Sequence, residues 1–179
     1  MSDGELQEIL RILKEGADAL AEALKDVDEA RAGNRPRPES WSPLECVEHL
    51  TLTERALLSR LREARPSDSS HEDRAREAKF QDLALNRSRR IEAPEPVVPK
   101  SREKNLAQAV EEFNATRKET VRFVEEFPGD LRWWLTTHPL ITRPVNCYEM
   151  LLLIAMHPRR HALQIEEARA SARQELSQE

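Results

Sequence analysis

The sequence predicts an all-α fold, a four-helix bundle with a long crossover between the second and third helices. Apolar residues recur every three or four positions in four long stretches, and charged side chains lie between them. Hydrophobic residues make up 39% and charged residues 34% of the 179-residue chain, which has only four glycines. This spacing places apolar side chains on one face of each helix, and a bundle buries those faces together.

Length and charge restrict the class of protein further. A single domain is expected over residues 1–179, because the chain can form one core and has no evident repeat. A net charge of −5 disfavours nucleic acid and anionic membranes as partners. The start lacks a signal peptide's features, and the apolar run 151–156 is too short to cross a bilayer. We therefore expect a cytoplasmic protein, in which Cys46 and Cys147 stay reduced.

The first helix is predicted from Leu6 until just before Gly33. Pro36 and Pro38 then make residues 34–41 a connector, since proline lacks an amide hydrogen and restricts the residue before it. The inward positions of this helix are Leu6, Leu10, Leu13, Ala17, Leu20, Leu24 and Val27.

The second helix has a clear start. In Ser42-Pro-Leu-Glu45, a capping hydroxyl, a proline at the first helical position and a glutamate three residues after the cap form a capping box. The helix should run to about Glu63. His49 lies on a stripe beside its apolar face and so borders the core.

Residues 66–100 break the helical pattern and form the predicted crossover. Residues 79–85 could make a short helix, and residues 91–99, which contain three prolines, look extended. The cluster Arg87-Ser-Arg-Arg90 is interpreted as a solvated linker rather than a phosphate site. So long a connection is unusual in a compact domain and calls for a functional or topological reason.

The third helix is predicted to open at Ser101 and to end at Pro128-Gly129. Its inward face is interrupted by Arg117 and Thr120. Either these side chains share a cavity with the histidines, or a rotated helix places Arg117 in solvent, and the second arrangement is slightly favoured. The apolar inward positions are Leu106, Val110, Phe113, Val124 and Phe127.

The fourth helix should start at Asn146-Cys-Tyr-Glu149, which repeats the pattern of a cap followed by glutamate. Residues 171–179 are expected to be a frayed tail. Pro158 should bend this helix, because it removes a backbone hydrogen bond. The inward seam of the helix is Met150, Ile154, His157, His161, Gln164 and Ala168.

The histidines of that seam indicate a metal site. His157 and His161 are four residues apart and therefore share a face, about 5–6 Å apart at Cβ. Burial removes hydration from an imidazole, so two inward rings need a stronger reason than filling space. Together with His49 they would provide three nitrogens and leave a coordination position open, as in catalytic zinc sites. The alternative is that each histidine is a satisfied core or boundary residue.

Two further residues are candidates for catalysis. Glu45 lies one turn before His49 and could orient its ring or act as a base, although its capping role explains it equally well. His138 could lie near the mouth of the bundle and donate a hydrogen bond or bind substrate. As a loop histidine, it could also simply be exposed.

Three segments of the chain resemble the DinB-like (YfiT-like) family of metalloenzymes. They are Trp41-Ser-Pro-Leu-Glu-Cys-Val-Glu-His49-Leu, His138-Pro, and His157-x-x-x-His161-x-x-Gln164-Ile. The resemblance implies a four-helix bundle with a long crossover and a divalent metal, often nickel, zinc or iron, on the three matched histidines. Because relatives include bacillithiol S-transferases and mycothiol-dependent isomerases, it also implies a low-molecular-weight thiol as a cosubstrate.

The expected function is that of a metal-dependent enzyme acting on a small molecule. The metal would activate a thiol, as in an S-transferase, or water, as in a hydrolase. Arg143, Arg159 and Arg160 are the candidates for binding the carboxylates of a thiol, although each could simply be solvated. The competing class is a non-catalytic metal-binding or stress-associated interaction protein. Helix faces of this length could also support a homodimer.

Overall fold

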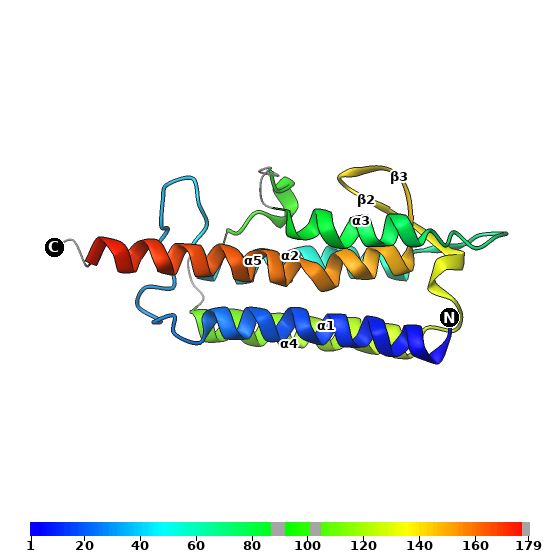
Figure 1. Cartoon of the computed structure of the whole chain (residues 1–179), viewed down its shortest axis with the longest axis horizontal. Helices are drawn as coiled ribbons and strands as arrows, with labels where there is room; N and C mark the ends of the chain where they lie inside the picture. Colours follow the sequence, from blue (N-terminus) through cyan, green and yellow to red (C-terminus); the bar gives the residue numbers. More distant parts are fainter. Residues whose placement is uncertain (87–91, 101–104, 177–179) are drawn as a thin grey trace.

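Four long helices pack together in the part of the chain that the computed structural model describes, which comprises residues 1–86, 92–100 and 105–176. Helix α1 packs chiefly against α5, and α2 packs against α4 and α5 (Figure 1). The structure is mostly helical, as the sequence predicted. The long helices are α1 (Asp3–Leu24), α2 (Pro43–Arg62), α4 (Leu106–Glu125) and α5 (Cys147–Leu176).

The first and last long helices run in the same direction. Figure 1 shows the N-terminus of the chain and the start of α5 at one end of the bundle. Helices α2 and α4 both end there, because each leads into a strand of the small sheet that precedes α5. The chain between α2 and α4 therefore returns along the length of the bundle.

The helix starts follow the capping signals in the sequence. The Ser42 hydroxyl accepts from the Glu45 amide, and the Glu45 carboxylate accepts from the Ser42 amide. Asn146 and Glu149 exchange the same pair of bonds at the start of α5. Both predicted starts are confirmed, because a capping box depends only on residues three apart.

The first helix differs from its prediction at both ends. It begins at Asp3, after a further capping box formed by Ser2 and Glu5, and it ends at Leu24, well before Gly33. Beyond Leu24 the chain forms turns, in one of which the Asp28 carboxylate accepts from the amide of Ala30. Aspartate competes with helical hydrogen bonding in this way, so the apolar spacing alone overestimated the helix.

A small antiparallel sheet departs from the all-α prediction. Its strands are β1 (Arg65–Pro66), β2 (Trp134–His138) and β3 (Ile141–Asn146), in the order β1-β2-β3. Leu135 of β2 pairs with Arg65 of β1 and with Asn146 of β3. Strand β1 has two residues and pairs with a segment about seventy residues away, so no local alternation of apolar residues reveals it.

The segment between α2 and α4 contains a further helix, α3 (Arg74–Leu85), and a 3₁₀ turn, η1 (Glu95–Val97). Helix α3 packs on α5, and η1 contacts α2. The predicted short helix is thus real but begins earlier, at a cap formed by Asp73. The stretch expected to be extended instead contains η1.

Several predicted features fall outside the described residues. These are the cluster Arg87-Ser-Arg-Arg90, residue 91 and the expected helix opening at Ser101; α4 is capped by Asn105. Helix α5 is helical to Leu176, within the segment expected to fray, and residues 177–179 are likewise not described.

Buried ion pairs attach α3 to the end of the bundle. The guanidinium of Arg132, which is 1% exposed, bonds Glu77 of α3 at 2.7 Å and Glu5 of α1 at 3.0 Å. It also lies 3.8 Å from the ring centre of Tyr148 on α5. Arg76 of α3 pairs with the buried Glu149. These contacts position α3 and the sheet relative to α5.

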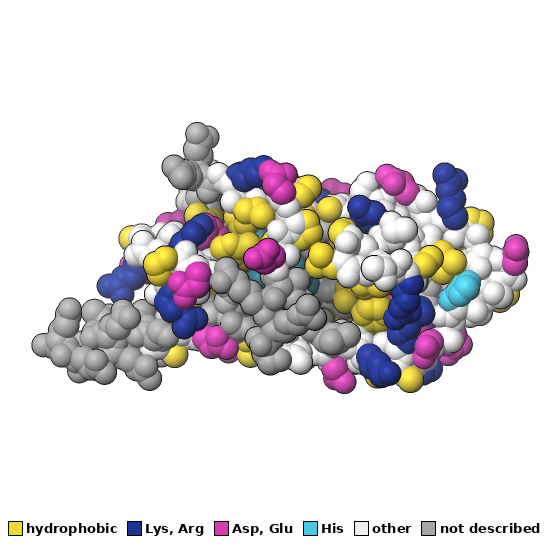
Figure 2. Space-filling model, turned by 90° about the horizontal axis from the view of Figure 1, so that it is seen from above, with side chains coloured by type: hydrophobic (Ala, Val, Ile, Leu, Met, Phe, Trp, Pro, Cys, Tyr) yellow, Lys and Arg dark blue, Asp and Glu magenta, His cyan; other side chains and the backbone are white. Residues whose placement is uncertain are grey.

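The surface has no dominant charge on the face shown in Figure 2, where acidic and basic side chains alternate with apolar ones. None of the helices in the described ranges combines the length and the apolar character needed to cross a membrane.

Candidate metal site

A polar layer divides the core of the bundle. On one side lies an apolar cluster that includes Leu57, Leu58 and Ile154, and on the other a cluster that includes Leu50 and Ile165. The buried polar residues of this layer come from α2, α4 and α5, and they are His49, Glu54, Thr116, Arg117, Thr120 and His161. Buried polar groups without partners destabilise the folded state, so a layer of polar residues in the core indicates a functional site.

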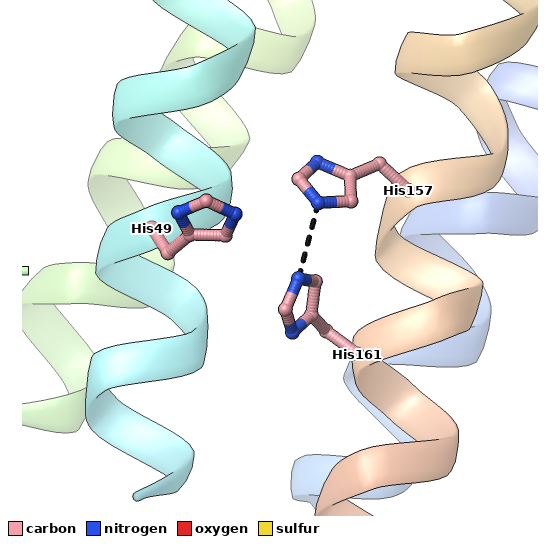
Figure 3. A group of neighbouring side chains, drawn as sticks. All are labelled: His49, His157 and His161. Carbon is pink, nitrogen blue, oxygen red and sulfur yellow. Dashed lines mark hydrogen bonds between the residues drawn. The ribbon is translucent and has the colours of Figure 1, made fainter. Parts of the chain in front are cut away.

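Three histidines meet within this layer. His49 projects from α2, and His157 and His161 project from α5 toward it (Figure 3). Their nitrogen ligand atoms all lie within 4.8 Å of one another, and the Nε2 atoms of His157 and His161 are 3.0 Å apart. His49 and His161 are buried and His157 is half-buried. The four-residue spacing of His157 and His161 places their rings on one face of α5, and the packing of α2 against α5 brings His49 to them.

A backbone carbonyl orients the ring of His49. Its Nδ1 lies 2.7 Å from the carbonyl oxygen of Val97 in η1. A carbonyl can only accept, so Nδ1 carries the hydrogen and Nε2 keeps its lone pair. The Thr53 hydroxyl lies 3.4 Å from this Nε2. Histidine ligands of metals are commonly held by such a second hydrogen bond.

The indole ring of Trp41 packs against the rings of His49 and His161. Its ring centre lies 4.5 Å from that of His49 and 5.9 Å from that of His161, and it is nearly parallel to the latter, at 19°. Sequence reasoning assigned Trp41 no role. The available signal was its position directly before the cap Ser42, which places its ring at the start of the helix that carries His49.

The environment favours the neutral forms of His49 and His157 by lowering the pKa of each ring. Burial lowers the pKa of His49, although its bond to Val97 opposes this. The pKa of His157 lies well below its usual range, first because of burial and then because of repulsion from His161 and His49. Nearby Arg160 and Arg117 lower it further. Neutral imidazoles offer the lone pairs that a metal ion requires.

The donor set fits a divalent cation. Nitrogens about 2.0–2.1 Å from a tetrahedral metal lie about 3.4 Å from one another, close to the 3.0 Å between His157 and His161. Within the described residues, the group comprises three imidazoles. A three-nitrogen set leaves a coordination position for water or substrate, which is the arrangement of catalytic rather than structural zinc sites.

The structure places the two predicted catalytic candidates in other contacts. Glu45 caps α2 and pairs with Arg35, whose Nε lies 2.9 Å from Oε2. Burial raises the pKa of Glu45, but bonds from Arg35 and Ser42 outweigh it and lower the pKa below its ordinary value. His138 lies at the end of β2, where its Nδ1 accepts from the amide of Leu140. Burial and then the charge of Arg60 lower the pKa of His138.

The three predicted arginines contact different elements. Arg143 lies over the ring of Phe80 in α3, 6.0 Å from its centre. Arg159 bonds Glu15 of α1 at 2.7 Å. Arg160 donates to the carbonyl of Asn86, just after α3, and its charge also acts on His157. Of the three, Arg160 is the one whose electrostatic influence on a histidine of the site is evident.

The fold and the histidines define a helical-bundle protein with a three-histidine group that could hold a divalent metal ion. The chain belongs to the DinB superfamily, since the model of that family matches residues 12–165. The resemblance inferred from the sequence is thus confirmed.

The fold is shared with a solved structure. YfiT from Bacillus subtilis, described as a probable metal-dependent hydrolase with an unusual four-helix bundle topology, is similar with a TM-score of 0.58. The match covers 94% of this chain and 87% of that one at 14% identity, so it shows the common fold. No curated protein sequence matches this chain.

Proposed function

We propose that the protein is a metal-dependent enzyme in which His49, His157 and His161 hold a divalent cation. The observation that supports this most is the convergence of three imidazoles from two helices, with all ligand atoms within 4.8 Å. Zinc, nickel and iron are the candidate ions, because imidazole is a suitable ligand for each. When bound, the cation would lower the pKa of water or of a thiol at its open position and so supply a nucleophile near neutral pH.

The residues around the histidines have separate tasks in this proposal. The Val97 carbonyl holds His49 with Nε2 directed away from η1, so this nitrogen is the ligand. Trp41 covers one side of the rings and limits the access of water. Thr53, whose hydroxyl lies 3.4 Å from the Nε2 of His49, is placed to bond a group that approaches this ligand.

Hydrolysis of a small molecule is the first candidate reaction, since the similar structure YfiT is described as a probable metal-dependent hydrolase. Transfer to a low-molecular-weight thiol is the second. The resemblance to DinB-like relatives that use such thiols suggests it, and Arg160, whose charge contributes to the lowered pKa of His157, is the candidate to bind a carboxylate of the thiol. The two reactions differ in whether product formation requires an added thiol.

Metal content is the first test. Untagged wild-type protein, His49→Ala and His161→Ala are purified identically, and their metals are measured by plasma mass spectrometry. His138→Ala is the matched control, because it removes a histidine on the sheet. We expect close to one equivalent of metal in the wild type and the control, and little in the other two variants. The absence of metal in all samples, even after reconstitution with zinc, nickel and ferrous iron, would contradict the proposal.

Turnover then separates the reactions from a non-catalytic role. Metal-loaded protein is assayed on ester and amide panels without thiol, and on electrophilic acceptors with thiols. Activity that His161→Ala abolishes and that needs no thiol supports hydrolysis, whereas activity only with thiol supports transfer. A fully loaded protein inactive on both panels would favour the metal-binding interaction protein.

A further inference from the structure

A buried arginine joins all four long helices beside the histidines. Arg117 of α4 is 6% exposed, which corrects the sequence expectation that it faces solvent. Its Nη1 donates to the Leu13 carbonyl of α1 at 2.9 Å. Its Nη2 donates to the Glu54 carboxylate of α2 at 2.8 Å and to the Ile154 carbonyl of α5 at 3.3 Å. These acceptors compensate the positive charge of Arg117 inside the core. The helical spacing of α4 alone did not reveal them, because they belong to other helices.

The Ile154 carbonyl needs a partner because of the proline that follows it. In an α-helix this carbonyl accepts from the amide four residues later, but that residue is Pro158, which has no amide hydrogen. A buried carbonyl without a donor destabilises the folded state. Arg117 of α4 supplies the donor instead, so the Ile154 carbonyl of α5 is hydrogen-bonded by a different helix.

The same part of α5 also lies unusually close to α1. A Cβ atom on Gly16 would lie 2.2 Å from the carbonyl oxygen of Ala155, closer than any normal contact. Helix α1 can approach here only because residue 16 has no side chain. Residues 154–158 of α5, which include His157, are therefore held by α1 on one side and by Arg117 on another.

The other end of this network reaches the helix of His49. Glu54 follows His49 on α2 by about one and a half turns, and it is 4% exposed. Its second oxygen accepts from the Thr120 hydroxyl at 2.8 Å. A buried ion pair is rarely more stabilising than apolar side chains of similar size, so stability alone does not account for it. What it does supply is directional bonding between α2, α4 and α5.

We infer that Arg117 is a positioning residue for the histidine site: it bonds Ile154 on α5 and Glu54 on α2, and thereby sets how His157 faces His49. The inference rests on the proposed function in taking the three histidines as metal ligands. Groups that hydrogen-bond the ligands of a metal site typically alter metal affinity about 10- to 100-fold when they are removed. Arg117 acts one step farther away, through the backbone of α5 and the side chain of Glu54, so we expect the lower end of this range.

The test uses cobalt(II), whose visible absorption reports ligand geometry. The double variant Glu54→Met/Arg117→Met replaces the buried pair with apolar side chains and avoids leaving one charge alone. We expect it to fold, to bind cobalt about 10-fold more weakly, and to show an altered spectrum. Arg62→Met/Glu119→Met is the matched control, because it removes a 3.1 Å surface ion pair between the same two helices. This control should keep wild-type affinity and spectrum.

Two more variants test the contribution of the Arg117 hydrogen bonds to cobalt binding. Arg117→Lys retains the charge beside Glu54 but loses the forked geometry, so it should fold and still weaken cobalt binding. Pro158→Ala, added to the double variant, returns an amide to the Ile154 carbonyl and should recover part of the lost affinity. Wild-type affinity and spectrum in both Arg117→Lys and the double variant would overturn the inference. So would a failure of Pro158→Ala to recover any affinity.

The outcomes for the two proposals are distinguishable. Wild-type protein that binds neither cobalt nor zinc, nickel or ferrous iron overturns the proposed function before any variant is compared. Wild-type protein that binds cobalt through His49 and His161, with Arg117→Lys and the double variant unchanged, overturns only the role of Arg117. Denaturant unfolding of each metal-free variant measures its folding separately from its metal binding.

Discussion

The imidazole of His49 and the backbone carbonyl of Val97 are joined by a 2.7 Å hydrogen bond. One partner belongs to α2 and the other to η1, in the long segment that leads to α4. This contact gives that segment a task beyond connecting two helices. It fixes the tautomer of one of the three histidines, and so it links the conformation of residues 95–97 to the candidate metal site.

The first prediction concerns this tautomer. In metal-free protein at neutral pH, His49 should carry its hydrogen on Nδ1, because the Val97 carbonyl can only accept. Two-dimensional ¹H–¹⁵N spectra that correlate the ring nitrogens with the ring protons distinguish the tautomers, and His49→Gln identifies the resonances. A protonated Nε2 in the folded, metal-free state would contradict the prediction.

The second prediction concerns the close approach of α1 and α5. Gly16→Ala should lower the free energy of unfolding by about 1–3 kcal/mol, because the added methyl group meets the Ala155 carbonyl and the helices must separate. Gly4→Ala, in the same helix, is the matched control, since a Cβ there meets nothing within 4 Å. Because alanine favours the helical state, Gly4→Ala should leave stability unchanged or raise it by up to about 1 kcal/mol. Equal effects of the two substitutions in urea unfolding would contradict the prediction.

The third prediction concerns Trp41, which lies against two of the candidate ligands. Nickel bound by the histidines should quench the indole fluorescence of Trp41 because of its proximity. Trp41→Phe should therefore lose most of the nickel-dependent quenching. Trp133→Phe, which replaces a tryptophan that is 43% exposed, should retain it. Quenching that survives in Trp41→Phe would place the bound ion elsewhere.

The fourth prediction concerns stability at acidic pH. The amide of Ser2, then the side chain of Arg74, and more weakly the charge of Arg132 lower the pKa of Glu5 from 4.5 to about 2, against an opposing effect of burial. The folded state thus binds this proton less readily than the unfolded state. The stabilisation is complete above pH 4.5 and is lost as the pH falls toward 2.

Two variants test this pH dependence. Glu5→Gln should flatten the decrease in unfolding free energy between about pH 4.5 and 2, measured by urea unfolding at each pH. Ser2→Ala removes the cap hydroxyl but leaves the ion pairs of Glu5, so its curve should lie between those of Glu5→Gln and the wild type. A Glu5→Gln curve with the full wild-type slope would show that other carboxylates determine the acid response.

Local sequence patterns account for the starts of α2 and α5 and for the shared face of His157 and His161. Ser42 and Glu45, and likewise Asn146 and Glu149, are three residues apart, so both capping boxes follow from the chain itself. The four-residue spacing of His157 and His161 places them on one face of any α-helix. Strand β1 escaped prediction because it pairs with β2 across a long stretch of sequence, which no local period encodes, whereas β2 and β3 form a local hairpin.

The sequence by itself determined the helical class, the starts of α2 and α5 and the three histidines that could share an ion, because helical periodicity and capping depend on residues within one or two turns. Only the tertiary structure decided that Arg117 points inward, that Val97 orients His49 and that Trp41 covers the rings. Each of these depends on a partner in another element, such as the Ile154 carbonyl that Pro158 leaves without an amide. Whether a polar side chain is buried depends on the hydrogen-bond partners that folding brings to it, and the local sequence does not specify those partners.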